Sequence, residues 1–303
     1  MIAVDWGTSS LRLYRMADDG QVRERRRSDQ GVMACAGRFG EVLAREIVGW
    51  DDTDVLLCGM VGGRGGWHEM PYLPCPAGNH ALAMGMQRFL PPGFEDRALW
   101  LVPGLRDSGS DAVPDVMRGE ETQLAALLDV LPGGAHQVCL PGTHSKWVTV
   151  RDGQVQRIAT AMTGELYALL RQHGTLGQLM PAGETRFDGY AFDAGIKRSA
   201  DTGGLLHHLF GVRAAGLFQQ FAEAALPSYL SGLLIGHELR ASGLLSHAPR
   251  PAQVHLIGND RLLTSYAHAL TSLGVGVQRH PEDLAARGLH ALWMRRAMAT
   301  ATT

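Results

Sequence analysis

Two short loops carry residues that could bind a nucleoside triphosphate together with a metal ion. The first, residues 5–10 (DWGTSS), places a carboxylate at the end of a predicted strand beside a Gly-Thr turn. Such a carboxylate can hold hydrated magnesium, while the N–H groups and hydroxyls of the turn point at phosphate oxygens. The second loop, residues 141–146 (PGTHSK), offers the same groups and adds the charge of Lys146. Because phosphoryl transfer needs mainly positioning and charge neutralisation, two facing loops of this kind predict a phosphotransferase.

Each loop is a weak motif alone, and the pair is the stronger signal. Asp5 is the expected Mg²⁺ ligand, through water, and belongs with the catalytic residues. The alternative for Lys146 is a surface lysine on a hairpin. The residues in or next to the two loops that are expected to contact phosphate are Gly7, Thr8, Ser9, Arg12, Gly142, Thr143, His144, Ser145 and Lys146.

An internal repeat indicates how the two loops are positioned. Residues 2–27 and 138–158 follow one plan of strand, Gly-Thr turn, strand, Asp-Gly turn and strand. The sequence Asp-Gly-Gln-Val occurs at 19–22 and again at 152–155, and an Asp-Gly pair between apolar runs is a hairpin signal. Chance occurrence of two common turns is the alternative. The repeat predicts two duplicated α/β lobes with mixed sheets. The lobes comprise residues 1–134 and 135–303, and a central cleft separates them.

The remaining pattern continues both halves as alternating helices and strands. We expect strands at 54–58, 98–102, 253–257 and 274–278, and helices near 38–49, 79–90, 119–130, 163–173, 203–210, 213–225, 227–241, 260–273 and 281–299.

Composition limits the classes of function. A chain of 303 residues is long enough for two domains, and a net charge of −2 argues against a nucleic-acid partner. Its apolar runs are too short to span a membrane, and the N-terminus enters a strand without a basic leader. The four cysteines are scattered, as is typical of reduced thiols. We therefore expect a cytoplasmic protein.

Long strings within the chain resemble one family, the 2-dehydro-3-deoxygalactonokinases, in the sugar-kinase branch of the actin/hexokinase/Hsp70 superfamily. The resemblance runs from end to end and rests on DWGTSSLR (5–12), GMVGGRGGWHEMPYLPCPA (59–77), RGEETQ (118–123), LPGTHSKWV (140–148), MTGELYALLRQHGTLG (162–177) and SYLSGLLIGHEL (228–239). It implies ATP as the phosphate donor, Mg²⁺ as the cofactor and the 6-hydroxyl of 2-dehydro-3-deoxy-D-galactonate as the acceptor. Similar kinases bind adenosine at a late Gly-Gly pair, which is Gly258-Asn259 here.

The resemblance also implies a catalytic base at the start of the helix near 119–130. Similar kinases carry an aspartate there, whereas this sequence has Glu120 and Glu121. We favour Glu121, because the polar Thr122-Gln123 then precedes the small-residue helix, and we keep Glu120 as the other candidate. A favourable interaction with the helix dipole is the alternative explanation for both glutamates. If neither acts, Asp111 or Asp115 is next.

A glycine-rich loop at 59–77 is the expected acceptor site. Arg64 lies among four glycines, and its guanidinium is a bidentate donor suited to the carboxylate of a sugar acid. We predict substrate contacts from Gly63, Arg64, Gly65 and Trp67. A plain loop with Trp67 covering the core is the alternative.

Other enzyme classes lack their motifs. The chain has no GxxxxGK[ST] and no GxGxxG after the first strand, which excludes P-loop kinases and argues against dinucleotide oxidoreductases. Kinases of other sugars, sugar acids or amino sugars, and an actin-like ATPase without a small acceptor, stay open. The partners expected are a sugar acid and ATP, with no nucleic acid and no membrane, and a homodimer is a possible assembly.

Overall fold

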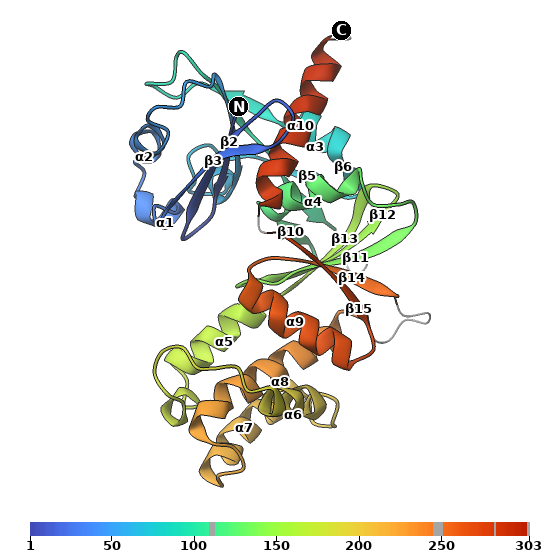
Figure 1. Cartoon of the computed structure of the whole chain (residues 1–303). Helices are drawn as coiled ribbons and strands as arrows, with labels where there is room; N and C mark the ends of the chain where they lie inside the picture. Colours follow the sequence, from blue (N-terminus) through green and yellow to red (C-terminus); the bar gives the residue numbers. More distant parts are fainter. Residues whose placement is uncertain (109–112, 245–250, 282, 302–303) are drawn as a thin grey trace. The chain divides into compact units, whose positions relative to one another are not determined.

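The computed structural model describes residues 1–108, 113–244, 251–281 and 283–301, which fall into two compact units (Figure 1). Unit 1 comprises Met1–Ala135, Val148–Ile158 and Pro281–Thr303, and unit 2 comprises His136–Trp147 and Ala159–His280. The first passage between units falls next to the predicted boundary at 134/135. The units are not contiguous in sequence, however, since two later segments return to unit 1. We keep as a prediction that residues 1–134 carry the first phosphate loop, the sugar-acid site and the catalytic carboxylate, and that residues 135–303 carry the second phosphate loop and the adenosine site.

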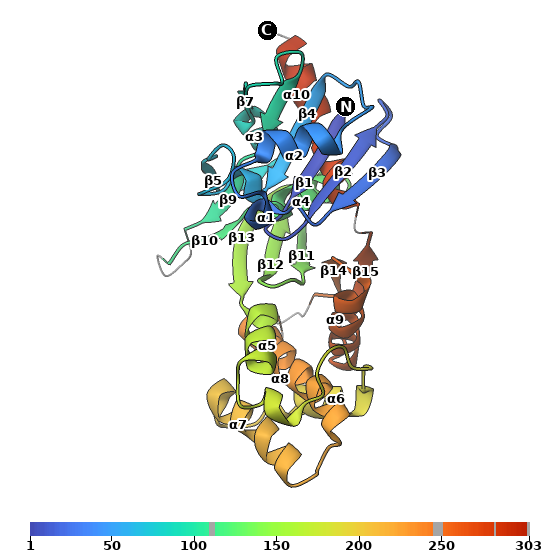
Figure 2. The same ribbon diagram turned by 90° about the vertical axis from the view of Figure 1, so that its left-hand side faces the viewer.

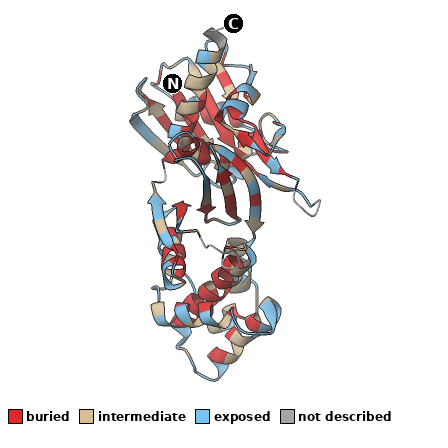
Figure 3. Cartoon of the chain, turned by 90° about the vertical axis from the view of Figure 1, so that its right-hand side faces the viewer, coloured by how far each residue is buried: buried red, intermediate tan, exposed pale blue. Residues whose placement is uncertain are grey.

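Unit 1 is built on a six-stranded sheet whose strand order is β3-β2-β1-β4-β8-β7 (Figure 2). The central strands β1 and β4 pair in parallel and are almost wholly buried (Figure 3), as expected for apolar strands covered on both faces. The bounds are β1 Ile2–Trp6, β2 Leu11–Met16, β3 Val22–Ser28, β4 Asp54–Gly59, β7 Gln87–Phe89 and β8 Ala98–Leu101.

Helices cover this sheet. The short helices α1 (Val32–Cys35) and α2 (Phe39–Glu46) contribute Cys35, Phe39 and Leu43 to the core formed by alternate residues of β1. The C-terminal helix α10 (Leu284–Ala301) packs against β1 and against α4 (Glu120–Leu128). The contact is close at Gly288, where an added Cβ would lie 1.7 Å from the Thr122 carbonyl oxygen. Helix α3 (Asn79–Gly85) also contacts α10.

The strand order of unit 1 is repeated in the second half of the chain. The order β13-β12-β11-β14-β15 matches β3-β2-β1-β4-β8, and β11–β14 and β14–β15 pair in parallel like β1–β4 and β4–β8. The bounds are β11 Ala135–Leu140, β12 Ser145–Arg151, β13 Gln154–Ala161, β14 Gln253–Ile257 and β15 Gly276–His280. Both Asp-Gly pairs form the predicted turns, with Gly20 and Gly153 at φ +81° and +74°. The predicted duplication is therefore confirmed.

The sequence did not indicate several short strands. Strand β6 (Ala77–Gly78) pairs with β13, and a three-stranded sheet forms from β10 (Asp115–Met117), β9 (Gly104–Asp107) and β5 (Tyr72–Pro74). The helix predicted over 79–90 ends at Gly85, and β7 follows it.

Unit 2 adds helices to its strands: α5 Thr163–Gln172, α6 Gly189–Arg198, α7 Gly204–Leu217, α8 Leu226–Ala241 and α9 Asp260–Ser272. Helix α8 is buried along most of its length and packs against α5, α6, α7 and α9. Helix α7 runs through the break predicted at 211–212, and α6 was not predicted. Within the described part of the chain, no helix is both long and apolar enough to cross a membrane.

Candidate active-site elements

The first Gly-Thr turn joins β1 to β2 and is held by the segment that follows β3. Gly7 N donates to Ser10 O at 2.9 Å, and Met33 N donates to Thr8 O at 3.2 Å. An added Cβ at Gly31 would lie 2.4 Å from Thr8 O, so only glycine allows this approach. The side chains of Thr8 and Ser9 are exposed. The turn thus presents two hydroxyls to solvent on a fixed backbone, and Gly31 is a supporting residue that sequence reasoning missed.

Asp5 lies near the end of β1, with its side chain 16% exposed. It pairs with Arg12 across the β1–β2 ladder, and Arg12 Nη1 contacts Asp5 Oδ2 at 3.2 Å. On its other side Asp5 pairs with Cys58 of β4. Arg12, predicted to contact phosphate, therefore makes an ion pair with the predicted metal ligand.

The three predicted catalytic carboxylates gather around the buried thiol of Cys58. Thr122 Oγ1 of α4 lies 3.3 Å from Cys58 Sγ. Burial raises the pKa of Cys58 well above its usual value, and the negative charges of Asp5, Glu121 and Glu120 raise it further. The backbone permits this convergence because Gly119, at φ +108°, packs on Gly59 at the end of β4.

Burial distinguishes the two glutamates that begin α4. Glu121 is 0% exposed, its Oε2 accepts from Gly119 N at 2.7 Å, and its Oε1 has no hydrogen-bond partner among the described residues. Burial, then the neighbouring Glu120 charge, raise the pKa of Glu121 to about 8. Glu120 is partly exposed, and its Oε2 accepts from Arg118 N at 3.2 Å. Only Glu120 is open to solvent here.

The glycine-rich loop divides into an exposed tip and a packed base. Arg64 and Gly65 are exposed, whereas Gly63 is buried. Trp67 contacts the rings of Trp6, Phe39, Phe89 and Phe94 at centroid distances of 5.1–6.3 Å. Trp67 thus packs on the hydrophobic core, as in the alternative considered for it.

Arg118 is a cation at the base of this loop that sequence reasoning passed over. It is 9% exposed, donates from Nη2 to Met70 O at 2.7 Å and stacks on Tyr72 at 4.2 Å. Its Nε and Nη1 have no partner in the described part of the chain, and Nη1 lies 3.3 Å from where a Cβ of Gly62 would be. No spacing rule would have found it, because its position depends on the contact between the loop and α4.

The other candidates for the catalytic base are Asp111 and Asp115. Asp115 lies in β10, partly exposed, with Oδ1 accepting from Val116 N at 2.8 Å. Asp111 lies outside the described residues.

The second Gly-Thr turn, in unit 2, joins β11 to β12 and contacts the start of α5. Thr143 O accepts from Glu165 N at 2.9 Å, and a Cβ at Gly164 would lie 2.3 Å from Gly142 O. His144 Nε2 contacts Glu165 Oε2, while the Thr143 side chain is exposed. The turn is therefore held rigidly while a hydroxyl stays accessible.

Ser145 and Lys146 point away from solvent. Ser145 is 0% exposed and bonds Tyr266 at 2.8 Å, which in turn donates to Glu238 at 2.6 Å. Lys146 is 8% exposed, and its Nζ donates to Thr160 Oγ1 at 2.8 Å. The alternative of a surface lysine is therefore wrong.

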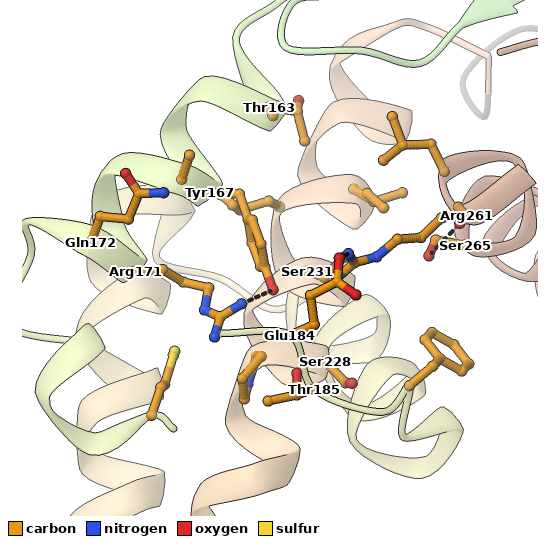
Figure 4. A pocket seen from close by; sticks show the side chains of 18 of the residues that line it. Thr163, Tyr167, Arg171, Gln172, Glu184, Thr185, Ser228, Ser231, Arg261 and Ser265 are labelled. Atoms are coloured by element: carbon orange, nitrogen blue, oxygen red, sulfur yellow. Dashed lines mark hydrogen bonds and ion pairs between the residues drawn. The ribbon is translucent and has the colours of Figure 1, made fainter. Parts of the chain in front are cut away.

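Unit 2 contains a cavity of about 1060 Å³, a size suited to a nucleotide. Gly142 and Asn259 line it together with side chains of α5, α8 and α9, including Tyr167, Ser231 and Arg261 (Figure 4). Asn259 caps α9 by accepting from Leu262 N at 3.0 Å. Gly258 packs on Pro141, so the two predicted binding segments, 141–146 and 258–259, meet at this cavity.

The predicted site residues thus form two groups. Unit 1 holds Asp5, Gly7, Thr8, Ser9, Arg12, Gly63, Arg64, Gly65, Trp67, Glu120 and Glu121, and unit 2 holds Gly142, Thr143, His144, Ser145, Lys146, Gly258 and Asn259. That both groups line one cleft stays a prediction.

The duplicated strand order is that of the actin/hexokinase-type fold. The activator of the 2-hydroxyisocaproyl-CoA dehydratase from Clostridium difficile shares this fold, with a TM-score of 0.54 at 11% identity over 100% of this chain and 98% of that chain. The model of the family described as 2-keto-3-deoxy-galactonokinase matches residues 5–292, and the chain belongs to this family.

Relatives support the same assignment. The chain is 38% identical over 296 residues to the probable 2-dehydro-3-deoxygalactonokinase DgoK1 of Rhizobium meliloti (strain 1021), covering 95% of each. It is 34% identical over 292 residues to the 2-dehydro-3-deoxygalactonokinase of Escherichia coli (strain K12), covering 94% of each. A crystal structure from Sinorhizobium meliloti, described as that of a putative 2-dehydro-3-deoxygalactonokinase protein, superimposes with a TM-score of 0.88 at 36% identity over 98% of both chains.

Proposed function

We propose that this protein transfers the γ-phosphate of ATP to the 6-hydroxyl of 2-dehydro-3-deoxy-D-galactonate in the cytoplasm, as a step of galactonate catabolism. The observation that carries the proposal is the family match over residues 5–292, which includes both Gly-Thr turns, the start of α4 and the unit 2 cavity. The reaction class is phosphotransfer to an alcohol group.

ATP is assigned to the cavity of unit 2. Its volume suits a nucleotide, and it is lined by Gly142 of the second turn and by Asn259 at the start of α9. The turn can offer backbone N–H groups and the Thr143 hydroxyl to phosphate oxygens. Ser145 and Lys146, both buried, would act behind the turn by holding its geometry.

Mg²⁺ is assigned to Asp5 through water. Magnesium keeps several waters and is commonly bound by one or two carboxylates together with substrate phosphates. A partly exposed carboxylate beside a turn with exposed hydroxyls fits this mode, and Asp5 meets that description. When bound, the ion would neutralise charge on the phosphates.

The proton of the acceptor hydroxyl is assigned to the carboxylates that begin α4. A base must touch the hydroxyl and must be ionised at the working pH. With a pKa of about 8 and no exposure, Glu121 is mostly protonated at neutral pH and out of reach. We therefore give Glu120 the contact with the acceptor and Glu121 a positioning role behind it, which reverses the order expected from sequence.

The acceptor carboxylate is assigned to the glycine-rich loop. The Arg64 guanidinium at the exposed tip can make a bidentate contact with a carboxylate. The buried Arg118 at the base adds positive charge and ties the loop to α4 through Met70. Trp67 would contribute by anchoring the loop on the core.

A coupled assay of ATP consumption tests the assignment. The acceptors are 2-keto-3-deoxy sugar acids that differ in one stereocentre, with the matching neutral sugars as controls. We expect the galactonate-derived acid to have the highest kcat/KM and the neutral sugars to have negligible activity. Preference for a neutral or amino sugar would establish another sugar kinase, and hydrolysis independent of every acceptor would establish an ATPase.

A further inference from the structure

Helix α8 carries one acidic side chain, Glu238, and it is buried. Glu238 is 5% exposed, and most of its buried neighbours along the helix are apolar. A glutamate is rarely buried this far unless other groups donate hydrogen bonds to it, because removing a carboxylate from water is costly. Neither the phosphate turns nor the acceptor site, as assigned above, includes Glu238.

The carboxylate of Glu238 receives hydrogen bonds from three other elements of unit 2. Trp147 of β12 donates from Nε1 to Oε1 at 2.7 Å, and Tyr266 of α9 donates from its hydroxyl to Oε2 at 2.6 Å. The hydroxyls of Thr163, which begins α5, and of Ser145, which begins β12, also bond the carboxylate. Burial raises the pKa of Glu238 above its usual value, while these four hydrogen bonds favour the ionised form and offset part of the rise. One side chain thus joins β12, α5 and α9 to α8.

The groups that Glu238 joins belong to the wall of the cavity assigned to ATP. Thr163 and Tyr266 both line this cavity, and Figure 4 labels Thr163 at the start of α5. Glu238 is bonded to both but is not itself part of the lining. The start of α5 also packs on the second Gly-Thr turn, since a Cβ at Gly164 would lie 2.3 Å from Gly142 O. The carboxylate therefore helps to set where the turn, α5 and α9 lie relative to one another.

A carboxylate also fixes the direction of the hydrogen bonds around it, because it accepts and does not donate. Tyr266 has a single hydroxyl proton, which it donates to Glu238, so Ser145 is the donor in the 2.8 Å contact between Ser145 and Tyr266. Every proton of this network is thus directed toward Glu238. A glutamine has the same shape but places an NH₂ group where a donor needs an acceptor, and leaving a buried donor unpaired is costly.

We propose that Glu238 is a positioning residue of the nucleotide site, acting through Ser145 and Thr163 on the second Gly-Thr turn and the cavity wall. The inference rests on the proposed function, since it takes ATP as the ligand of the cavity. The turn binds phosphate oxygens through N–H groups whose directions depend on its backbone, so a small displacement weakens several contacts together. Glu238 does not touch the nucleotide and acts only on the residues that do.

Titration of the full-length protein with a non-hydrolysable ATP analogue and Mg²⁺, in the absence of acceptor, tests the proposal. Glu238→Gln should raise the dissociation constant of the analogue about tenfold or more, as expected when a buried donor loses its acceptor. In steady-state kinetics KM for ATP should rise by a similar factor. KM for the sugar acid, whose site is assigned to unit 1, should not change, and a general loss of folding would not divide the two constants in this way.

Ser199→Ala is the matched control within unit 2. Ser199 is 4% exposed, its Oγ accepts from Arg240 Nε of α8 at 3.1 Å, and it does not line the cavity. Loss of this hydroxyl removes a buried hydrogen bond to the same helix, two residues after Glu238. We expect a lower midpoint of thermal unfolding and an unchanged dissociation constant for the analogue.

Tyr266→Phe provides a second variant, in case Glu238→Gln folds poorly by circular dichroism. It keeps the aromatic ring and removes the hydroxyl that connects Ser145 to Glu238. This variant should also weaken binding of the analogue. Combining it with Glu238→Gln should add little, because both substitutions interrupt the same chain of hydrogen bonds.

The outcomes separate this inference from the proposed function. A wild-type protein that does not bind the analogue would overturn both. A wild-type protein that binds it, together with unchanged affinity in Glu238→Gln, would overturn the inference alone, and so would unchanged affinity in Tyr266→Phe if Glu238→Gln does not fold. An equal loss of affinity in Ser199→Ala would also overturn the inference, because Glu238 would then contribute only to the stability of unit 2.

Discussion

Replacing Glu121 by glutamine should make the stability of unit 1 less sensitive to pH. The carboxyl of Glu121 is fully buried, and its pKa is raised from 4.5 to about 8. An acid with a raised pKa in the folded state is held neutral by folding. Its contribution is fully present below the unfolded pKa and is lost as pH rises toward the folded value, because the unfolded chain gains by ionising. The wild-type protein therefore loses stability as the pH rises from the unfolded pKa to the folded pKa of Glu121. The Glu121→Gln variant has no ionisable group at this position and does not show this loss.

The magnitude follows from proton linkage. With pKa values of 4.5 and about 8, the stability of the wild type relative to Glu121→Gln should fall by about 3 kcal/mol between roughly pH 5 and pH 8. In urea unfolding this corresponds to a relative shift in midpoint of about 1 M. Tryptophan fluorescence reports mainly on unit 1, which contains five of the six tryptophans.

The test is how the stability difference between Glu121→Gln and the wild type changes with pH, and not the size of that difference at any one pH. Any loss of stability caused by placing an amide in the site of Glu121 is the same at both pH values. It therefore cancels when the stability difference between the variant and the wild type is compared at the two pH values. Glu41→Gln, at an exposed position of α2 in the same unit, should follow the wild type at both pH values. Parallel curves for Glu121→Gln and wild type would mean that Glu121 ionises normally, and the reason for assigning the acceptor proton to Glu120 would be lost.

Three further predictions concern catalysis. Glu120→Gln should lower kcat by roughly 10²–10⁴-fold with little change in KM, whereas Glu121→Gln should retain more activity; the opposite ranking in steady-state kinetics would restore Glu121 as the base. Arg64→Ala should raise KM for the sugar acid about tenfold, as expected for a charged hydrogen bond at an exposed site, and leave KM for ATP unchanged; equal changes in both constants would make Arg64 structural. Removal of divalent metal should abolish turnover, and Asp5→Asn should shift the magnesium titration to higher concentration; a titration identical to wild type would remove Asp5 from the metal site.

Local sequence signals predicted the hairpins and several helix boundaries well. Asp-Gly and Gly-Thr turns depend on a few adjacent residues, so both repeats could be located without tertiary information. The strand at 253–257 and the helix from 260 were predicted where they occur, because the apolar run ends at a residue that caps the next helix, Asn259. The short strands β5, β9 and β10 were missed because each has only three or four residues, too few to show an alternating pattern.

The site was predicted less completely than the fold. Asp5 lies near the end of its strand and Thr8 and Thr143 occupy turns, as expected, since those positions follow from the repeat. The burial of Glu121 was not predictable, because it depends on the packing around α4. Arg118 was missed for the same reason, since its partners Met70 and Tyr72 lie more than forty residues away.

The position of α10 has a consequence for synthesis on the ribosome. Of the helices and strands that the structure describes, this helix is translated last, yet it packs against β1 and against α4, which carries Glu120 and Glu121. Most of unit 1 therefore emerges from the exit tunnel long before its final helix can dock. During that interval the surface of unit 1 that receives Leu289 and Leu292 is exposed, and the nascent chain could aggregate through it. Both leucines are fully buried in the folded protein. Premature termination before residue 284 would leave the nascent protein with this apolar surface uncovered, making it a client for chaperones and proteases.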